Sequence, residues 1–151
     1  MSTVESRLAD LGLSVPEVVP PVAAYVPAKR VGNLVYTSGQ LPMRDGALIA
    51  TGKLGGGVDP ELAKEAAQLC ALNAIAAVKA LIGDLEQVKQ VVKVVGFVAS
   101  TPEFTGQPAV INGASELLAA AFADGAHARS AVGVPVLPLD ASVEVEIIVE
   151  V

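Results

Sequence analysis

The sequence has few aromatic and few basic residues, no tryptophan, one cysteine and one histidine. Aromatics make up 3% of the 151 residues, whereas hydrophobic residues, mostly Val, Ala, Leu and Ile, make up 52%. Ten Lys and Arg stand against sixteen Asp and Glu, which gives a net charge of -6. Because phosphate binding draws on clustered Lys and Arg, this balance disfavours nucleic acid as a partner.

The single cysteine and the single histidine exclude several kinds of site. Cys70 cannot form an internal disulfide, and its apolar helical context predicts a buried, unreactive thiol. His127 has no accompanying Cys/His/Asp cluster in the sequence, so the pattern indicates no metal site. Neither a Ser-His-Asp nor a Cys-His arrangement can be assigned from the sequence. The role of His127 stays open.

Long apolar runs are also missing. No run reaches the roughly 18 residues of a spanning helix, and the N-terminus MSTVESRLADLGL has the wrong charges and length for a signal peptide. We therefore expect a cytoplasmic protein with no membrane partner. The length suits a single domain over residues 1–151, with residues 1–20 forming a helix and an extended lead-in. The excess of small aliphatic residues predicts apolar surface that is covered by subunit contacts.

The N-terminal half predicts a helix, a hairpin and a loop. Residues 3–13 have amphipathic spacing, and Pro16, Pro20 and Pro21 end that helix. Two strands are expected over 23–29 and 34–38, joined by a turn at Val31-Gly32-Asn33. The following glycine-rich segment lacks the Gly-Lys-Ser/Thr ending of a phosphate-binding loop. We expect residues 44–58 to form a mobile loop or lid.

Two helices and a strand are expected next. Asp59 and Pro60 begin a long helix that ends near Gly83. Its predicted inward stripe contains Leu62, Ala66, Leu69, Asn73, Ala76 and Ala80. The Asn73 amide must then find partners inside the protein. Residues 88–99 are rich in valine and predict a central strand covered on both faces. A helix over 107–123 would leave Asn112 solvated, because it falls off the apolar stripe.

The last 26 residues, 126–151, contain the strongest pattern. A strand-like run carries Arg129, a connector contains Pro138 and Asp140, and a final run alternates valine and isoleucine with glutamate. The short connector predicts neighbouring antiparallel strands, with Glu144 within reach of Arg129. The planar guanidinium of Arg129 matches a carboxylate in two parallel hydrogen bonds. The alternative is that Arg129 only pairs with surface glutamates.

The order of elements predicts an α+β domain with two main helices on one face of a mixed sheet. Several segments also resemble the RidA/YjgF family, the reactive intermediate (enamine/imine) deaminases. They are Ala128-Arg129-Ser130, Leu137-Pro138, Val143-Glu144-Val145-Glu146, and the stretch from Gly32 to Gln40 that reads GNLVYTSGQ. Together they bracket residues 23–151. The resemblance implies a chorismate-mutase-like fold and a homotrimer with clefts between subunits.

The resemblance also implies a site and a reaction. The matching positions are Tyr25, Ser38, Gly39, Asn112, Arg129 and Glu144. Arg129 would hold the carboxylate of a 2-imino acid or its enamine tautomer, Ser38 and the Gly39 backbone would position it, and Glu144 would orient or deprotonate water. The products would be a 2-oxo acid and ammonia, without metal or cofactor. Many members have a cysteine where Ala131 stands here, and Ala23-Ala24 replaces the usual Gly-Pro before Tyr25.

Other interpretations remain open. Without the resemblance, Tyr25 reads as half-buried packing and Ser38 as a turn residue. A different class of function is a ligand-binding or interaction trimer that uses Arg129 to hold small carboxylates without turnover. A third interpretation is an endoribonuclease, a label that some relatives carry, but the acidic charge disfavours it.

Overall fold

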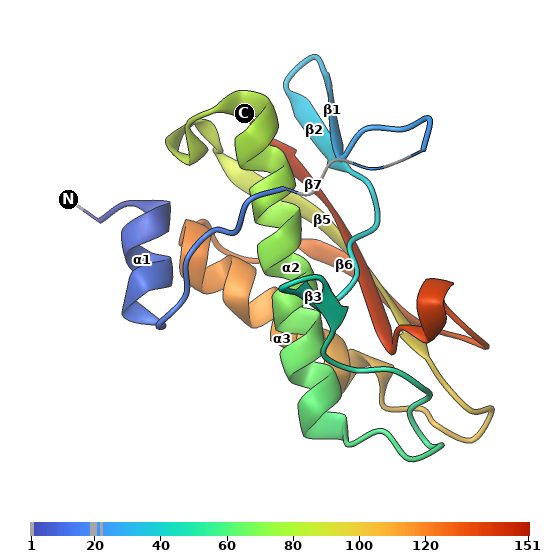
Figure 1. The fold of residues 1–151 in the computed structure, drawn as a ribbon. Helices are drawn as coiled ribbons and strands as arrows, with labels where there is room; N and C mark the ends of the chain where they lie inside the picture. Colours follow the sequence, from blue (N-terminus) through green and yellow to red (C-terminus); the bar gives the residue numbers. More distant parts are fainter. Residues whose placement is uncertain (1, 19–20, 22) are drawn as a thin grey trace.

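The computed structural model describes residues 2–18, 21 and 23–151, and Pro20 of the predicted lead-in lies outside the described residues. The elements follow one another along the chain as in Figure 1. They are α1 (Val4–Asp10), β1 (Ala28–Val31), β2 (Leu34–Thr37), β3 (Met43–Arg44), β4 (Ala47–Leu48), α2 (Pro60–Ile82), η1 (Leu85–Gln87), β5 (Gln90–Ala99), α3 (Gln107–Phe122), β6 (Ala128–Val134), η2 (Pro138–Asp140) and β7 (Val143–Glu150).

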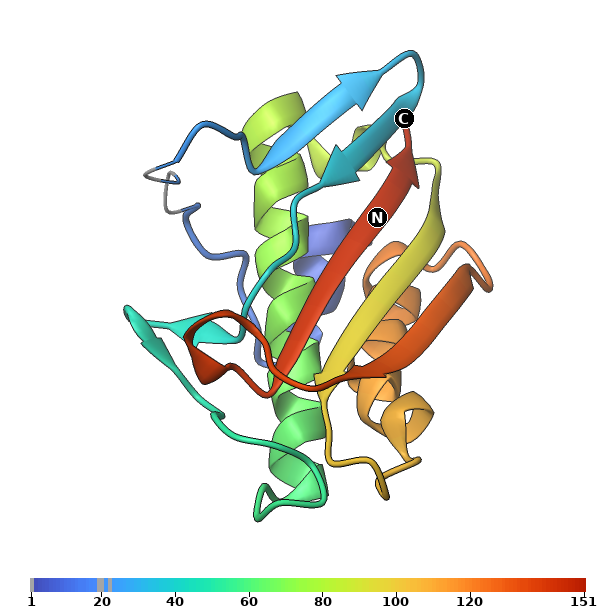
Figure 2. The ribbon, with the colours of Figure 1, turned by 90° about the vertical axis from the view of Figure 1, so that its right-hand side faces the viewer.

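The main sheet has five strands in the order β1-β2-β7-β5-β6. Strands β5 and β6 run parallel, and the other neighbours are antiparallel, so the sheet is mixed. Figure 2 shows α1, α2 and α3 on one face of this sheet. The opposite face carries no α-helix within the described part of the chain. The predicted α+β class with helices on one face is confirmed.

The predicted pairing of the last two strands is wrong. β5 lies between β6 and β7 and pairs with both of them. The helix α3 connects β5 to β6 as a parallel crossover, which places β6 on the outer side of β5. The chain then passes through η2 to the other side of β5, where β7 lies between β5 and β2 and pairs with both.

The long helix α2 begins and ends as its sequence predicts. The Asp59 carboxylate accepts a hydrogen bond from the Glu61 amide at 3.0 Å, and Gly83 ends the helix with a φ of +84°. The predicted stripe is only partly right: Leu62 and Ala80 are exposed, because the buried face turns toward both the sheet and α3. The Asn73 side chain donates to two backbone carbonyls, those of Leu41 and Met43, as expected.

By length and composition alone, α2 could cross a membrane, although its longest stretch without a charged residue, residues 66–78, is shorter than the roughly 18 residues of a spanning helix. However, 61% of its apolar window is buried inside the protein. That burial against α3 and the sheet is typical of a core helix.

The glycine-rich segment is not a lid. It contains the β3–β4 hairpin and then packs against the sheet through Leu54, which is fully buried. The Leu54 amide donates to the Ala99 carbonyl at 2.8 Å, and the Thr101 amide donates to the Leu54 carbonyl at 2.9 Å. Residues 44–58 are therefore attached to the end of β5, and the prediction of a mobile segment is wrong.

Two strand predictions need correction. β1 begins only at Ala28, so residues 23–27 are not part of a strand. β5 is central, as predicted, but it is buried on the helical face only. On the other face, Val95 and Phe97 stay half-buried within one chain. The helix expected over 3–13 is the shorter α1, which the Thr3 side chain caps.

Candidate functional site

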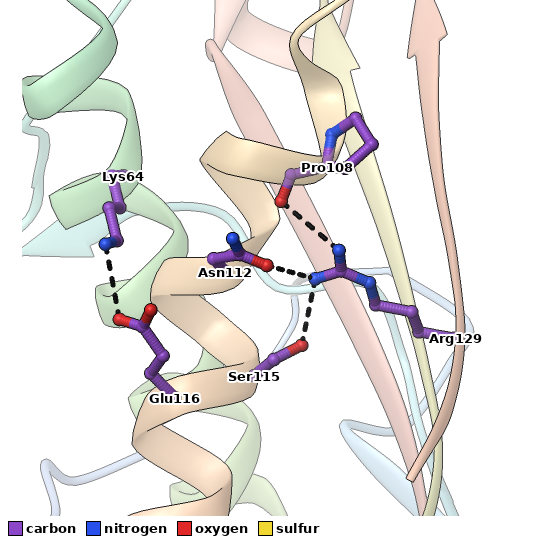
Figure 3. Close-up of polar contacts among 6 residues, drawn as sticks. All are labelled: Lys64, Pro108, Asn112, Ser115, Glu116 and Arg129. Carbon is purple, nitrogen blue, oxygen red and sulfur yellow. Dashed lines mark hydrogen bonds and ion pairs between the residues drawn. The ribbon is translucent and has the colours of Figure 1, made fainter. Parts of the chain in front are cut away.

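Arg129 reaches from β6 to α3, where several acceptors hold its guanidinium (Figure 3). Its Nη1 donates to the Asn112 side-chain oxygen at 2.8 Å and to the Ser115 hydroxyl at 3.2 Å. Its Nη2 donates to the Pro108 carbonyl at a longer 3.4 Å. The prediction of a solvated Asn112 is wrong, because this amide orients the arginine.

These contacts leave one edge of the guanidinium free. Nη1 has two protons and two acceptors, whereas Nε of Arg129 has no hydrogen-bond partner among the described residues. The Nε–H and the adjacent Nη2–H point in the same direction, which is the fork that a carboxylate accepts with both oxygens. None of the ion pairs within the described residues includes Arg129, so pairing with surface glutamates does not occupy it.

His127 lies beside this group. Its Nε2 is 2.9 Å from the Ser115 hydroxyl oxygen, so a single hydroxyl contacts both His127 and Arg129. Burial lowers the pKa of His127, the positive charge of Arg129 lowers it further, and the negative charge of Asp124 opposes them. Sequence reasoning missed Ser115, although it lies three residues after Asn112 and hence on the same face of α3.

A second group forms where β2 ends. The Ser38 hydroxyl donates to the Val26 carbonyl at 2.6 Å, and the Ser38 amide donates to the Pro27 carbonyl at 2.8 Å. These bonds fix the segment that carries Tyr25 to the end of β2. The Tyr25 side chain itself is 58% exposed, which contradicts the interpretation of half-buried packing.

Gly39 and Glu144 belong to this second group. A Cβ atom on Gly39 would overlap the Glu144 carboxylate, so any larger residue at this position would require the Glu144 side chain to shift. Glu144 is half-buried; this burial raises the pKa of its carboxyl, and the neighbouring Glu146 raises it further. Such a carboxyl titrates closer to neutral pH than an ordinary glutamate.

One chain does not bring the two groups together. Arg129 lies opposite Val94 on the helical face of the sheet, whereas Glu144 lies opposite Phe97 and alternates with valines that point to the helices. The two residues are thus on opposite faces, and their strands are two spacings apart, about 10 Å. The prediction that Glu144 lies within reach of Arg129 on a neighbouring strand is wrong for a single chain.

The hollows of a single chain lie elsewhere. A groove of about 840 Å³ runs between α2 and α3, and its lining residues include Lys64 and Glu116, which form an ion pair at 3.3 Å. A smaller hollow of about 100 Å³ lies on the open sheet face beside Tyr36, Lys93 and Glu146. Neither of these two hollows is lined by Arg129 or Glu144.

The remaining candidate chemistry is limited. The Cys70 thiol is fully buried, which raises its pKa well above the usual value, so the prediction of a buried thiol is confirmed. Within the described residues, no cluster of three His, Cys, Asp or Glu side chains could hold a metal ion.

The fold and the comparisons with known proteins define the class. The sequence profile described as "YjgF/chorismate mutase-like, putative endoribonuclease" matches residues 5–151. The chain therefore belongs to the YjgF family, and the resemblance noted in its sequence is confirmed.

Individual relatives cover nearly the whole chain. The protein TCP17 of Trypanosoma cruzi is 42% identical over 149 residues, which are 97% of this chain and 93% of TCP17. The crystal structure of an Agrobacterium tumefaciens protein of unknown function is 51% identical, with a TM-score of 0.91 over 98% of this chain and 92% of that one. The crystal structure of a Shewanella oneidensis protein described as "a putative endoribonuclease" is 35% identical, with a TM-score of 0.94 over 99% of this chain and 100% of that one.

Proposed function

We propose that this protein is a homotrimeric, cofactor-independent enamine/imine deaminase whose site is shared between subunits. In this proposal, the Arg129 group of one subunit faces the Ser38–Gly39–Glu144 group of the next. The observation that carries the proposal is the free edge of the Arg129 guanidinium, which Asn112 and Ser115 hold in place. A fixed fork of this kind suits a carboxylate. The Glu144 carboxyl that would activate water lies on the opposite face of the sheet in the same chain, so a second subunit would have to supply it.

The open face of the sheet supports association. It exposes apolar side chains of several strands, with Val31 at 59%, Tyr36 at 42% and Val132 at 43% exposure. Half-buried Val95 and Phe97 lie between them on β5. Lys93 and Glu146 lie among these side chains, so the face is mixed, but exposed apolar groups on several strands of a small protein favour a contact surface. A second copy that covers it would also bring a second set of site residues to the first chain.

The proposed reaction adds water to the C=N carbon of a 2-imino acid. Arg129 binds the substrate carboxylate, and the Ser38 hydroxyl oxygen and the Gly39 backbone position the imine. Glu144 takes a proton from water as the oxygen bonds to the carbon, and the C=N electron pair moves to nitrogen. Glu144 returns this proton to the nitrogen, and the nitrogen takes a second proton from the new hydroxyl as the C–N bond breaks, so that ammonia leaves and the C=O of the 2-oxo acid forms. The raised pKa of Glu144 suits a group that both accepts and returns a proton.

A coupled assay tests this function. An amino-acid oxidase generates imines in solution, and ammonia release is followed with and without the protein. We expect ammonia release to be faster with the wild-type protein than by spontaneous hydrolysis. The Arg129→Gln variant should give no acceleration. Equal rates of ammonia release with and without the wild-type protein would show that it is not an imine deaminase.

A non-catalytic carboxylate-binding trimer is the second candidate, and the same free edge of Arg129 favours it. It predicts Arg129-dependent binding of 2-oxobutyrate with no acceleration of imine hydrolysis. A protein of the same fold, TdcF of E. coli, has been solved with bound serine, which carries a carboxylate. Isothermal titration calorimetry combined with the coupled assay separates the two candidates.

Endoribonuclease activity rests on the names of the family and of the Shewanella relative. The net charge of -6 opposes it, because an RNA-binding surface needs clustered positive charge. Incubation with end-labelled single-stranded RNA should therefore give no cleavage above that of a buffer control. Cleavage that an Arg129→Gln variant abolishes would favour the nuclease instead.

A further inference from the structure

The Ser115 hydroxyl on α3 contacts two side chains that lie two residues apart in the sequence, one cationic and one that can become cationic. It is 3.2 Å from Nη1 of Arg129 on β6 and 2.9 Å from Nε2 of His127, which precedes that strand. The function proposed above gives Ser115 only the role of holding Arg129, and it gives His127 no role. Ser115 contacts Nη1, on the side of the guanidinium opposite the free edge, and His127 contacts Ser115 in turn. The two residues therefore lie behind the proposed carboxylate site.

Hydrogen-bond roles in this chain depend on the protonation of His127. Arg129 can only donate, so the Ser115 oxygen accepts its bond. The Ser115 hydroxyl proton is then available for Nε2 of a neutral His127. A protonated His127 must instead donate from Nε2, so the Ser115 oxygen accepts from both neighbours and turns its own proton elsewhere.

The charges around His127 tie this change to the occupancy of Arg129. The charged groups that act on the imidazole are Arg129 on β6 and Asp124 in the connector after α3. The positive charge of Arg129 disfavours the protonated form of His127. The two side chains contact the same Ser115 hydroxyl. A carboxylate on the free edge of Arg129 would cancel part of that positive field and so favour protonation.

Building on the proposed carboxylate site, we propose that Ser115 and His127 are its positioning residues. Ser115 fixes Nη1 of Arg129, and His127 holds the Ser115 hydroxyl and takes up a proton when a carboxylate binds. The sign of the coupling follows from linkage: the bound state has the higher His127 pKa and holds more protons, so the affinity rises as pH falls through that pKa.

Because His127 is the only histidine, its ring resonances report this coupling without assignment ambiguity. An NMR titration of the imidazole Cε1–H is run on the full chain with and without saturating 2-oxobutyrate. We expect the ligand to raise the pKa of His127. In Arg129→Gln without ligand, the pKa should already be raised, because the charge is gone, and 2-oxobutyrate should no longer change it.

The outcomes separate this inference from the proposed function. If 2-oxobutyrate binds and the His127 titration does not move, the inference is wrong and the carboxylate site stands. If 2-oxobutyrate does not bind, the proposed site fails, and the Arg129→Gln titration still tests the coupling: an unchanged His127 pKa in that variant would overturn it.

Variants separate positioning from a merely structural role. Ser115→Ala should weaken 2-oxobutyrate binding roughly fivefold, the worth of one hydrogen bond, and Ser115→Thr should restore it. His127→Gln can still bond to Ser115 but cannot take up a proton. It should bind like the wild type at about pH 8 and lose much of the gain in affinity on acidification to about pH 6. The same gain in both proteins would contradict the role of His127.

Discussion

At the scale of single residues, the proposed carboxylate site depends on the shape of the Arg129 guanidinium. Arg129→Lys keeps the charge but loses the fork and the contacts with Asn112 and Ser115. We expect 2-oxobutyrate to bind about 10- to 100-fold more weakly, because a bidentate charged pair becomes a single contact. Calorimetry measures the change, with Arg44→Lys on the exposed β3–β4 hairpin as the matched control. Equal affinities of the two variants for 2-oxobutyrate would show that Arg129 does not form the carboxylate site.

A substitution at Glu144 distinguishes a catalytic role of the site from carboxylate binding alone. Glu144→Gln keeps the shape of the side chain but removes the base, so turnover should fall about 10²- to 10⁴-fold while carboxylate binding is unchanged or tighter. In the wild type, the rate should fall as pH drops through the raised pKa of Glu144, because the base must be ionised. Glu146→Gln is the control on the same strand: it should keep the plateau rate and shift this fall to lower pH. Rates that are unaffected by Glu144→Gln would exclude it as the base.

The sheet faces on which the candidate residues lie could be predicted from the sequence only in part. The alternation of valine and glutamate correctly indicates that Val143 and Val145 face the helices and Glu144 faces away. The run around Arg129 consists mostly of small residues without that contrast, so its face was not predictable. Asn112 looked solvated, since the apolar stripe of a helix does not show a polar partner that arrives from a distant strand.

At the scale of elements, the connector before β7 misled the sequence interpretation for a physical reason. A short Pro-containing link does favour antiparallel neighbours, and β6 and β7 do run in opposite directions. The pattern of one connector contains no information on whether a third strand already occupies the edge between them. Here the parallel β5-α3-β6 unit fills that edge.

The glycine-rich segment gives a prediction at this scale. Leu54 is fully buried under the end of β5, so Leu54→Ala should lower the free energy of unfolding by about 2–5 kcal/mol. Its more exposed neighbour provides the control: Lys53→Ala should change stability by less than about 0.5 kcal/mol. Urea unfolding followed by circular dichroism measures both. A mobile lid would instead give two equally small effects.

At the scale of the whole molecule, activity should depend on the open sheet face. Val132→Asp places a charge on the exposed apolar surface of β6, so we expect monomers in light scattering at micromolar concentration and loss of turnover. Leu81→Asp changes a similarly exposed leucine on α2, on the helical side, and should leave the assembly intact. A wild type that is itself a monomer, or an active monomeric Val132→Asp variant, would contradict the shared site.

Mixing two inactive variants tests the shared site most directly. Arg129→Gln and Glu144→Gln subunits are unfolded together, refolded at equal amounts and assayed for imine hydrolysis. If each site joins Arg129 of one subunit to Glu144 of another, random mixing leaves about a quarter of the interfaces with both residues native. The account predicts that turnover recovers to about a quarter of the wild-type rate. Activity no higher than that of the separately refolded variants would show that the two groups do not meet between subunits.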